Sequence, residues 1–257
     1  MATKHTPKAG TTLPMDDRHV NMSNSLARAS HSLSLAEKRV IACGIANTNS
    51  VGANDFNMSV LKGGGWVIKV TAAEFKETFG LSEVTAYEQL AYVAKTLTKR
   101  DWQTIEPSKR KGKSIITRYP WVARSKYHEG EGWIELEFTH YTAPHLLALK
   151  KNFTSYKLSN GSALRSLYSW RLMECLASWK STGVWHVPID EFHHAMDTTA
   201  SHKKDFGMLR RSVIDPAVRE LRDTQNMQLD YKVIKTGRKV ASLIFEFSPN
   251  PQKTLFD

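Results

Sequence analysis

The sequence has 257 residues, enough for one large domain or two of ordinary size, and its 41% hydrophobic and 24% charged residues are typical of a globular protein rather than a disordered or fibrous one. The 36 Lys and Arg residues against 25 Asp and Glu residues give a formal net charge of +11. Such an excess favours a densely anionic partner, nucleic acid before an anionic membrane, although charge alone also fits a merely soluble basic protein.

Nothing in the sequence predicts export or membrane insertion. No run approaches the roughly 18 apolar residues needed to span a bilayer, and the N-terminus lacks the apolar core of a signal peptide. We therefore expect a cytoplasmic protein without a membrane partner. Cys43 and Cys175 could form one disulfide, but two buried thiols are the better interpretation in that compartment. Residues 1–17 and 249–257 are polar and contain proline, which predicts a flexible arm and a flexible tail.

The first half of the chain predicts a helix-turn-helix followed by strands. The capping-box pattern Ser34-Leu35-Ala36-Glu37 indicates the start of a helix, and a strand follows over 66–70. A helix over 72–79, ended by Gly80, is joined by a glycine-containing turn to a second helix that begins at Ser82. Three further strands are predicted: 102–106, 114–125 and 133–138.

The second half repeats this order. A helix is predicted from Ser162, and Arg171 interrupts its apolar stripe, so we expect this arginine at the edge of the buried face. The following strand, two helices and hairpin are predicted over 184–187, 189–196, 204–223, and 227–234 paired with 239–247. The longer helix should kink or restart at Pro216, which lacks a backbone donor. Thr236–Gly237 is the predicted turn of the hairpin, with glycine at the second central position.

Two segments indicate an internal duplication. Val70–Phe75 aligns without a gap on Val187–Phe192, and in both a strand leads into a helix whose second turn carries Glu-Phe. The shared order of helix, strand, helix, helix and β-hairpin supports the same interpretation. We therefore predict an α+β protein of two tandem winged-helix domains, over residues 18–150 and 151–248.

Basic side chains concentrate in the second half, where ten Lys and Arg between residues 203 and 239 stand against five acidic residues. The second helix of a helix-turn-helix enters the major groove, which is wide enough to admit it. The candidate DNA-binding residues lie on that helix and on the following hairpin tip: Lys203, Lys204, Arg210, Arg211, Lys235, Arg238 and Lys239. Arginine can pair bidentately with guanine, and lysine suits phosphate. The alternative is a solvated face with surface ion pairs, which we prefer for Arg219 and Arg222.

The first half is less basic on its second helix, where Thr85 and Lys95 are expected to face outward beside Glu88. Its stronger positive feature is a loop tip that we interpret as its wing: Lys109, Arg110, Lys111 and Lys113. We expect the N-terminal domain to contact the DNA backbone and to dimerise, and the C-terminal domain to bind DNA sequence-specifically.

Motifs for catalysis are weak. Four histidines lie close together in the sequence (His186, His193, His194 and His202), but adjacent residues of a helix point to different sides, and zinc needs three or four convergent ligands. The sequence also lacks a glycine-rich phosphate loop ending in Lys-Ser/Thr and a Gly-x-Ser-x-Gly elbow. We predict neither an enzyme nor a metal or cofactor site.

Several segments resemble the iteron-binding plasmid replication initiators of the RepE/RepB type. They are Asn24–Ala29, Leu33–Arg39, Phe153–Leu158, Ser166–Leu172, Leu209–Val218 and Lys235–Val240. The resemblance implies two winged-helix domains and a monomer that binds direct repeats (iterons) at a plasmid origin to start theta replication. It further implies a homodimer that represses its own promoter, host initiator and replicative helicase proteins as partners, and a location with the plasmid in the bacterial nucleoid.

By the same resemblance, Arg210 and Arg211 contact bases, and the basic residues of the last hairpin tip lie on the C-terminal wing. Ser212 stands where the family can have a third consecutive basic residue, which leaves the recognised repeat open. Two alternatives remain. A transcriptional regulator of the same fold would bind a lone inverted repeat, and an origin-nicking enzyme would need a tyrosine and a metal-binding histidine pair.

Overall fold

The computed structural model describes residues 14–48, 65–110, 112–147 and 151–249, and the predicted flexible arm and tail fall mostly outside these ranges. The helices of the first half are α1 (Asn24–Arg28), α2 (Leu35–Thr48), α4 (Ala72–Phe79) and α5 (Glu83–Thr96). Its strands are β1 (His19–Ser23), β2 (Trp66–Thr71), β3 (Asp101–Pro107), β4 (Ser114–Pro120), β5 (Val122–His128) and β6 (Trp133–Phe138).

The second half begins with β7 (Phe153–Lys157), α6 (Leu158–Ser162) and α7 (Leu167–Ala177). The elements that follow are β8 (Val184–Pro188), α8 (Ile189–Ala195), α9 (Ala200–Lys204), α10 (Phe206–Leu209), the π-helical turn η4 (Arg210–Ile214), α11 (Asp215–Thr224), β9 (Met227–Thr236) and β10 (Lys239–Pro249). Within the described ranges, no helix combines the length and the apolar character needed to cross a membrane.

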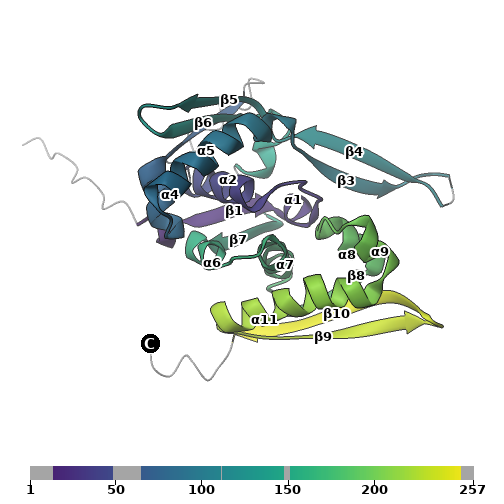
Figure 1. The fold of residues 1–257 in the computed structure, drawn as a ribbon. Helices are drawn as coiled ribbons and strands as arrows, with labels where there is room; N and C mark the ends of the chain where they lie inside the picture. Colours follow the sequence, from purple (N-terminus) through teal and green to yellow (C-terminus); the bar gives the residue numbers. More distant parts are fainter. Residues whose placement is uncertain (1–13, 49–64, 111, 148–150, 250–257) are drawn as a thin grey trace, which may run out of the picture.

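Each half contains a three-stranded antiparallel sheet of the same topology (Figure 1). The strand orders are β2-β6-β5 and β8-β10-β9. In each sheet the first strand leads directly into a helix, α4 or α8, and the other two strands form a hairpin that comes after the second helix. This repeated arrangement confirms the predicted α+β fold of two tandem winged-helix domains.

Local capping signals set the helix boundaries that the sequence predicts. The Glu37 amide donates to Ser34 Oγ at 3.3 Å and the Ser34 amide donates to Glu37 Oε2 at 2.7 Å, so the capping box starts α2 as expected. Thr71 and Glu74 form a second box at α4. Gly80 ends α4 with a φ of 59°, a left-handed conformation that glycine adopts without a Cβ clash.

The prediction of one strand over 114–125 is wrong, because two strands with different partners form there. β4 pairs with β3 in a separate two-stranded sheet, whereas β5 pairs with β6. Trp121 lies between them, fully buried, and its Nε1 donates to the carbonyl oxygen of His31 at 3.0 Å. The buried indole fixes the chain at the point where the strands change partners, and strand-forming residues on both sides hide that change in the sequence.

Two predictions about α7 are also wrong. Ser162 ends α6 instead of starting the helix, and α7 begins after Ser166, whose Oγ accepts from the amide of Tyr168 at 3.1 Å. Arg171 does not lie at the edge of the buried face, since only 1% of it is exposed. Acceptors from other segments surround its guanidinium, as described below.

The helix predicted over 204–223 extends over residues 206–224, with a break before it at Asp205 and a π-helical turn within it. Asp205 Oδ1 accepts from the amide of Met208 at 3.1 Å and caps α10. The π-helical turn η4 follows, and α11 starts at Asp215 with Pro216 in its first turn. The helix does not restart at Pro216, because η4 continues directly into α11 and Ile214 and Asp215 both keep right-handed helical φ and ψ. The irregularity next to the proline is the π-helical turn itself, and helices commonly depart from regular geometry at prolines and at π-helical turns.

A fourth sheet joins distant parts of the chain. β1 pairs antiparallel with β7, from His19 with Lys157 to Ser23 with Phe153. β7 follows the expected domain boundary at residues 150 and 151, so strands from both sides of that boundary share this sheet. The expected domain limits stay a prediction. The buried residues of both halves form one continuous hydrophobic core.

Candidate nucleic-acid interface

The candidate residues on the C-terminal helix-turn-helix are solvent-exposed. Lys203 and Lys204 end α9, and Arg210 and Arg211 begin η4. Of these four, only Arg210 has an ion-pair partner within the part of the chain that the structure describes. π-helical turns are rare and occur frequently at functional sites. The sequence therefore located an exposed basic surface here, but not the π-helical turn that presents it.

Arg210 belongs to a small polar group that the sequence did not indicate. Its Nε lies 3.2 Å from Asp215 Oδ2, and the Tyr231 hydroxyl donates to Asp215 Oδ1 at 2.6 Å. Burial, and then the hydrogen bond to Asp215, raise the pKa of Tyr231 to about 12, so this hydroxyl remains a donor at neutral pH. The Arg210 side chain is still 59% exposed, so the pairing orients it without burying it.

Arg211 and Ser212 differ in what they can offer to a ligand. A Cβ added at Gly207 would lie 3.2 Å from Arg211 Nη1, so the glycine leaves room for the guanidinium. The Ser212 hydroxyl donates to the Met208 carbonyl oxygen at 2.7 Å and lies 3.0 Å from His202 Nε2. Ser212 is thus satisfied within its own helix and neighbouring α9, whereas Arg211 projects into solvent.

The tip of the β9–β10 hairpin is basic and exposed. Thr236 pairs with Lys239, which leaves Gly237 and Arg238 as the two central residues of the turn. The predicted turn is thus wrong by one residue, and Gly237 occupies the first central position with a φ of 61°. Lys235, Arg238 and Lys239 all face solvent. Arg222 stabilises the base of this wing, because it pairs with Asp230 and donates to the Leu229 carbonyl oxygen at 2.6 Å.

In the N-terminal half, the basic loop is not the tip of the winged-helix sheet, and that interpretation is wrong. By topology, β5–β6 corresponds to the C-terminal wing β9–β10, since both hairpins pair with the strand that precedes the helix-turn-helix. Its tip carries Glu129 and Glu131. Lys109, Arg110 and Lys113 lie at the tip of the separate β3–β4 hairpin, and Lys111 lies outside the described residues.

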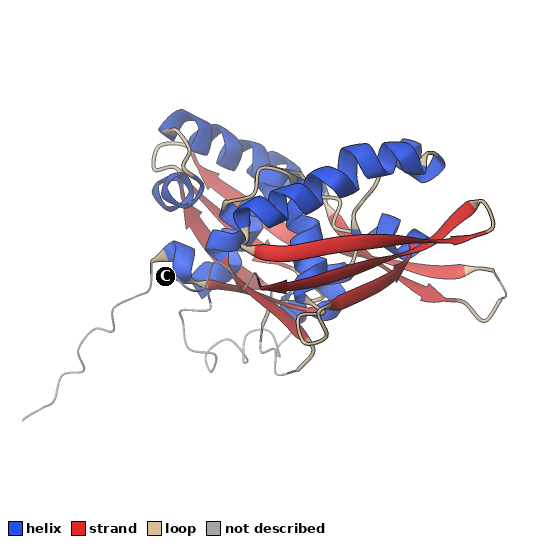
Figure 2. Cartoon of the chain, turned by 90° about the horizontal axis from the view of Figure 1, so that it is seen from below, coloured by secondary structure: helices blue, strands red, loops and turns tan. Residues whose placement is uncertain are grey.

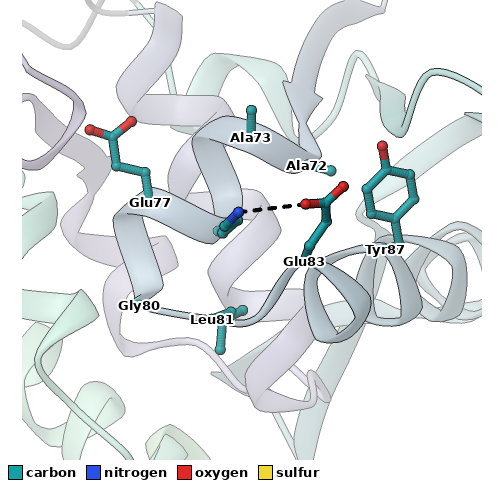
Figure 3. Close-up of a pocket in the computed structure, with 8 residues that line it drawn as sticks. Ala72, Ala73, Glu77, Gly80, Leu81, Glu83 and Tyr87 are labelled. Atoms are coloured by element: carbon teal, nitrogen blue, oxygen red, sulfur yellow. Dashed lines mark ion pairs between the residues drawn. The ribbon is translucent and has the colours of Figure 1, made fainter.

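The helix-turn-helix of the N-terminal half is partly acidic. A groove of about 520 Å³ lies between α4 and α5, and Glu77, Glu83 and Tyr87 contribute to its lining. Figure 3 shows Glu83 extending from the start of α5 toward α4, where it pairs with Lys76 at 3.6 Å. Carboxylates repel phosphates, so this end of α5 does not match the charge of a DNA backbone.

The two candidates on α5 lie at opposite ends of the helix. Thr85 is half-buried in the first turn, and its Oγ1 lies 2.8 Å from the Oγ of the N-cap residue Ser82. Lys95 is exposed in the last turn. The structure therefore separates these two residues. Only Lys95 lies in the last turn of α5, which precedes β3 in the chain.

Elements of both halves that carry exposed basic residues lie at one end of the molecule. The β3–β4 and β9–β10 hairpins project in the same direction in both views (Figures 1 and 2), and α9 lies at that end as well (Figure 1). The exposed basic residues gathered there, which we call the basic end, are Lys109, Arg110, Lys113, Lys203, Lys204, Lys235, Arg238 and Lys239.

The four histidines noted in the sequence have separate protein partners. His186 Nε2 lies 2.9 Å from Ser242 Oγ, and His193 Nδ1 lies 2.6 Å from Thr198 Oγ1. His194 contacts the carbonyl of β3, and His202 contacts η4. Within the described ranges, no three His, Cys, Asp or Glu residues are arranged to hold a metal ion.

Models of two protein families match the chain. The one described as "Initiator Replication protein, WH1" matches residues 19–177, and the one described as "Initiator Rep protein, WH2" matches residues 188–247. The WH1 match extends past the expected boundary at residue 150 and includes α7.

Individual proteins and structures are similar as well. An uncharacterized 27.6 kDa protein of Escherichia coli is 27% identical over 233 residues, which are 90% of this chain and 95% of that protein. A probable replication protein of Bifidobacterium longum is 25% identical over 100 residues, 39% of this chain and 33% of that protein. The crystal structure of Pi initiator protein in complex with iteron DNA superposes with a TM-score of 0.68 at 20% identity, covering 90% of this chain and 97% of that one.

Proposed function

This chain belongs to the initiator replication protein family, and from that premise we propose that it starts plasmid replication by binding direct repeats (iterons) at the origin. The observation that carries the proposal is the basic end, where two hairpin tips and α9 present exposed lysines and arginines on one side of the molecule. The similar Pi initiator was crystallised with iteron DNA, which supports the same ligand for this chain.

We assign base contacts to Arg210 and Arg211 and phosphate contacts to the lysines around them. The exposed guanidiniums lie on the second helix of the helix-turn-helix, the element that enters a major groove. Each bidentate arginine–guanine contact contributes roughly 1–3 kcal/mol of discrimination. The basic hairpin tips supply contacts to the sugar-phosphate backbone, which position the protein but carry no sequence information.

We further propose that a dimer of the chain represses its own promoter, while the monomer binds iterons. Support comes from the flanks of the β3–β4 hairpin, where Ile105, Ile115 and Ile116 are 48%, 51% and 57% exposed. Apolar side chains on exposed strand edges favour pairing with another chain. Host initiator and helicase proteins are proposed as the partners of the DNA-bound monomer, in the bacterial cytoplasm.

Footprinting on DNA that flanks the gene tests the proposed function. We expect protection of tandem direct repeats by the purified chain, and loss of specific protection when Arg210→Ala and Arg211→Ala are combined. Arg219→Ala is the matched control, because Arg219 is an exposed arginine of α11 outside the proposed contact. Protection of a lone inverted repeat, with plasmid copy number unchanged after the gene is deleted, would instead identify a transcriptional regulator.

A further inference from the structure

A polar seam connects the base of the β3–β4 hairpin to the end of α8, two elements that lie next to each other in Figure 1. The seam comprises residues 29–32, Gln103 of β3 and residues 194–197. The Gln103 amide donates to the Ser30 carbonyl oxygen at 2.9 Å, and His194 Nε2 donates to the Gln103 carbonyl oxygen at 3.0 Å. The base of the hairpin is therefore bonded on one side to the N-terminal half and on the other to α8.

Asp197 is the centre of this seam. Its Oδ2 accepts from the backbone amides of His31 at 2.8 Å and Ser32 at 3.1 Å, and its Oδ1 accepts from the Ser30 hydroxyl. Asp197 and Ser32 have φ values of 49° and 51°, a region that non-glycine residues rarely adopt. Such conformations persist only where the surrounding contacts enforce them. The carboxylate thus holds a strained loop against the end of α8.

Arg171 is hydrogen-bonded to both of the segments that Asp197 connects, residues 29–32 and residues 194–197. Its Nε and Nη2 donate to the Ala195 carbonyl oxygen at 3.1 and 2.8 Å, and Nη2 also donates to the Ala29 carbonyl oxygen at 2.6 Å. Its Nη1 donates to Glu174 Oε2 at 2.8 Å and to His31 Nδ1 at 3.1 Å. The guanidinium is buried with its N–H groups directed at acceptors, an arrangement that a shift of either segment would break.

The seam lies between the two sets of basic residues proposed to contact DNA. Asp197 lies two residues before Thr199, the N-cap of α9, whose last residues are Lys203 and Lys204. Gln103 lies near the start of β3, which leads to the tip bearing Lys109 and Arg110. The geometry of the seam therefore sets how far apart these basic residues stand.

We propose that Asp197 and Arg171 are positioning residues for DNA binding, which hold the β3–β4 hairpin and the C-terminal helix-turn-helix at a fixed spacing on one duplex. The inference rests on the proposed DNA-binding function. Two contacts on one rigid body reinforce each other, because the second forms without a new loss of orientational freedom. When the spacing is no longer fixed, the hairpin contacts no longer add to those of the helix.

A double-mutant cycle with Asp197→Asn measures this coupling. Asparagine tolerates a positive φ, but its amide group brings N–H donors to a site where three donors already converge on the carboxylate. The second arm of the cycle removes the hairpin tip charges with Lys109→Ala, Arg110→Ala and Lys113→Ala combined. The matched control is Asp190→Asn, the same change at an exposed position of α8.

Affinity is measured at fixed salt by fluorescence anisotropy on a duplex selected from random-sequence DNA by the wild-type chain. We expect the hairpin substitutions to weaken binding by about tenfold or more in the wild-type and Asp190→Asn backgrounds, because they remove phosphate contacts. In the Asp197→Asn background we expect the same substitutions to cost less than about twofold. If the hairpin substitutions reduced DNA affinity equally in all backgrounds, or did not reduce it in the wild type, the proposal would be overturned.

A distance measurement without DNA separates this inference from the proposed function. Spin labels at Lys113→Cys and Lys204→Cys report the spacing by pulsed dipolar spectroscopy, because Cys43 and Cys175 are buried and burial raises the pKa of Cys175 to about 11. We expect one narrow distance distribution in the wild type and a broad one in Asp197→Asn. The milder Ser30→Ala, which removes a single donor, should broaden it less.

The outcomes remain distinct even if one variant folds poorly. A narrow, unshifted distribution in a folded Asp197→Asn variant contradicts the positioning role, whatever the DNA result. If the wild-type chain selects no duplex, the proposed function fails, and if specificity persists without Arg210 and Arg211, the assignment of base contacts to them fails. In both cases the distances still test the seam. If Asp197→Asn does not fold, Ser30→Ala carries both measurements.

Discussion

Tyr231 on the wing strand β9 donates its hydroxyl to Asp215, the first residue of α11, at 2.6 Å. The other oxygen of the same carboxylate pairs with Arg210. One carboxylate therefore links the wing to the candidate base-contacting arginine. The same carboxylate places a negative charge beside a surface proposed to approach phosphates. Asp215 therefore orients Arg210 but lowers the affinity for DNA of any sequence.

Asp215→Asn should separate these two effects. We expect affinity for unrelated DNA sequences to rise a few-fold, because a charge that repels phosphate is removed. We expect the ratio of specific to unspecific binding to fall, because Arg210 loses the partner that orients it. Anisotropy titrations on the selected duplex and on a scrambled duplex measure both quantities. Asp223→Asn, at an exposed position near the other end of α11, is the control, and equal changes in the two variants would contradict the assigned role.

Glu174 should be among the least replaceable residues for stability. It is fully buried, and its Oε1 lies 2.6 Å from Lys38 Nζ while its Oε2 accepts from Arg171 at 2.8 Å. Glu174→Gln would leave two buried cations without a counterion, and breaking a buried pair costs about 3–5 kcal/mol. Chemical denaturation followed by circular dichroism measures the loss. Glu246→Gln, which removes the exposed partner of Lys232, should cost under about 1 kcal/mol.

Arg171 illustrates which features of the fold could be predicted from the sequence and which could not. Helix starts at Ser34 and Thr71 and the helix end at Gly80 depend on residues a few positions apart, so local patterns located them. Arg171 is buried because the acceptor at Ala29 comes from a loop far away in the chain, and no periodicity indicates such a partner. The same holds for Trp121, which separates β4 from β5.

In the candidate interface, too, features set by the local sequence were predicted, whereas features set by tertiary packing were not. The exposed basic residues of the C-terminal helix and wing were predicted from charge and element order alone. The β3–β4 tip was predicted as basic but wrongly interpreted as the wing, because the pairing of β5–β6 with β2 is a tertiary contact that the local sequence does not indicate. Asp215 and Tyr231 were not identified, since their relation to Arg210 arises only when β9 packs beside α11.

Stability should decrease at mildly acidic pH. Burial, and then the nearby charges of Arg171 and Lys38, hold the pKa of His31 well below its usual range. Burial also lowers the pKa of His193 and His194. The unfolded chain therefore takes up protons near pH 6.5 that the folded chain does not, so stability present above about pH 6.5 is lost as the pH falls toward the folded pKa values.

The free energy of unfolding, measured by urea denaturation between pH 8 and pH 5, tests this dependence. His31→Gln should flatten the decrease, because glutamine does not take up a proton. His140→Gln, at an exposed position, should leave the slope as in the wild type. A wild-type profile that is flat below pH 6.5, or a slope that His31→Gln does not change, would contradict the role of His31.

The two wings should differ in their contribution to DNA binding, because their tips have opposite charge. Arg238 lies in the exposed turn of β9–β10, whereas Glu129 lies in the exposed turn of the topologically equivalent β5–β6. Removing one phosphate-binding charge lowers the slope of log affinity against log salt by about 0.9. Arg238→Ala should therefore reduce that slope by about one unit and weaken binding evenly across sequences. Glu129→Gln should change neither, since charges beyond about one Debye length, roughly 8–10 Å, are screened. If Glu129→Gln strengthened binding and steepened the salt dependence, the N-terminal wing would lie against the DNA, and the duplex would extend past the basic end along α5.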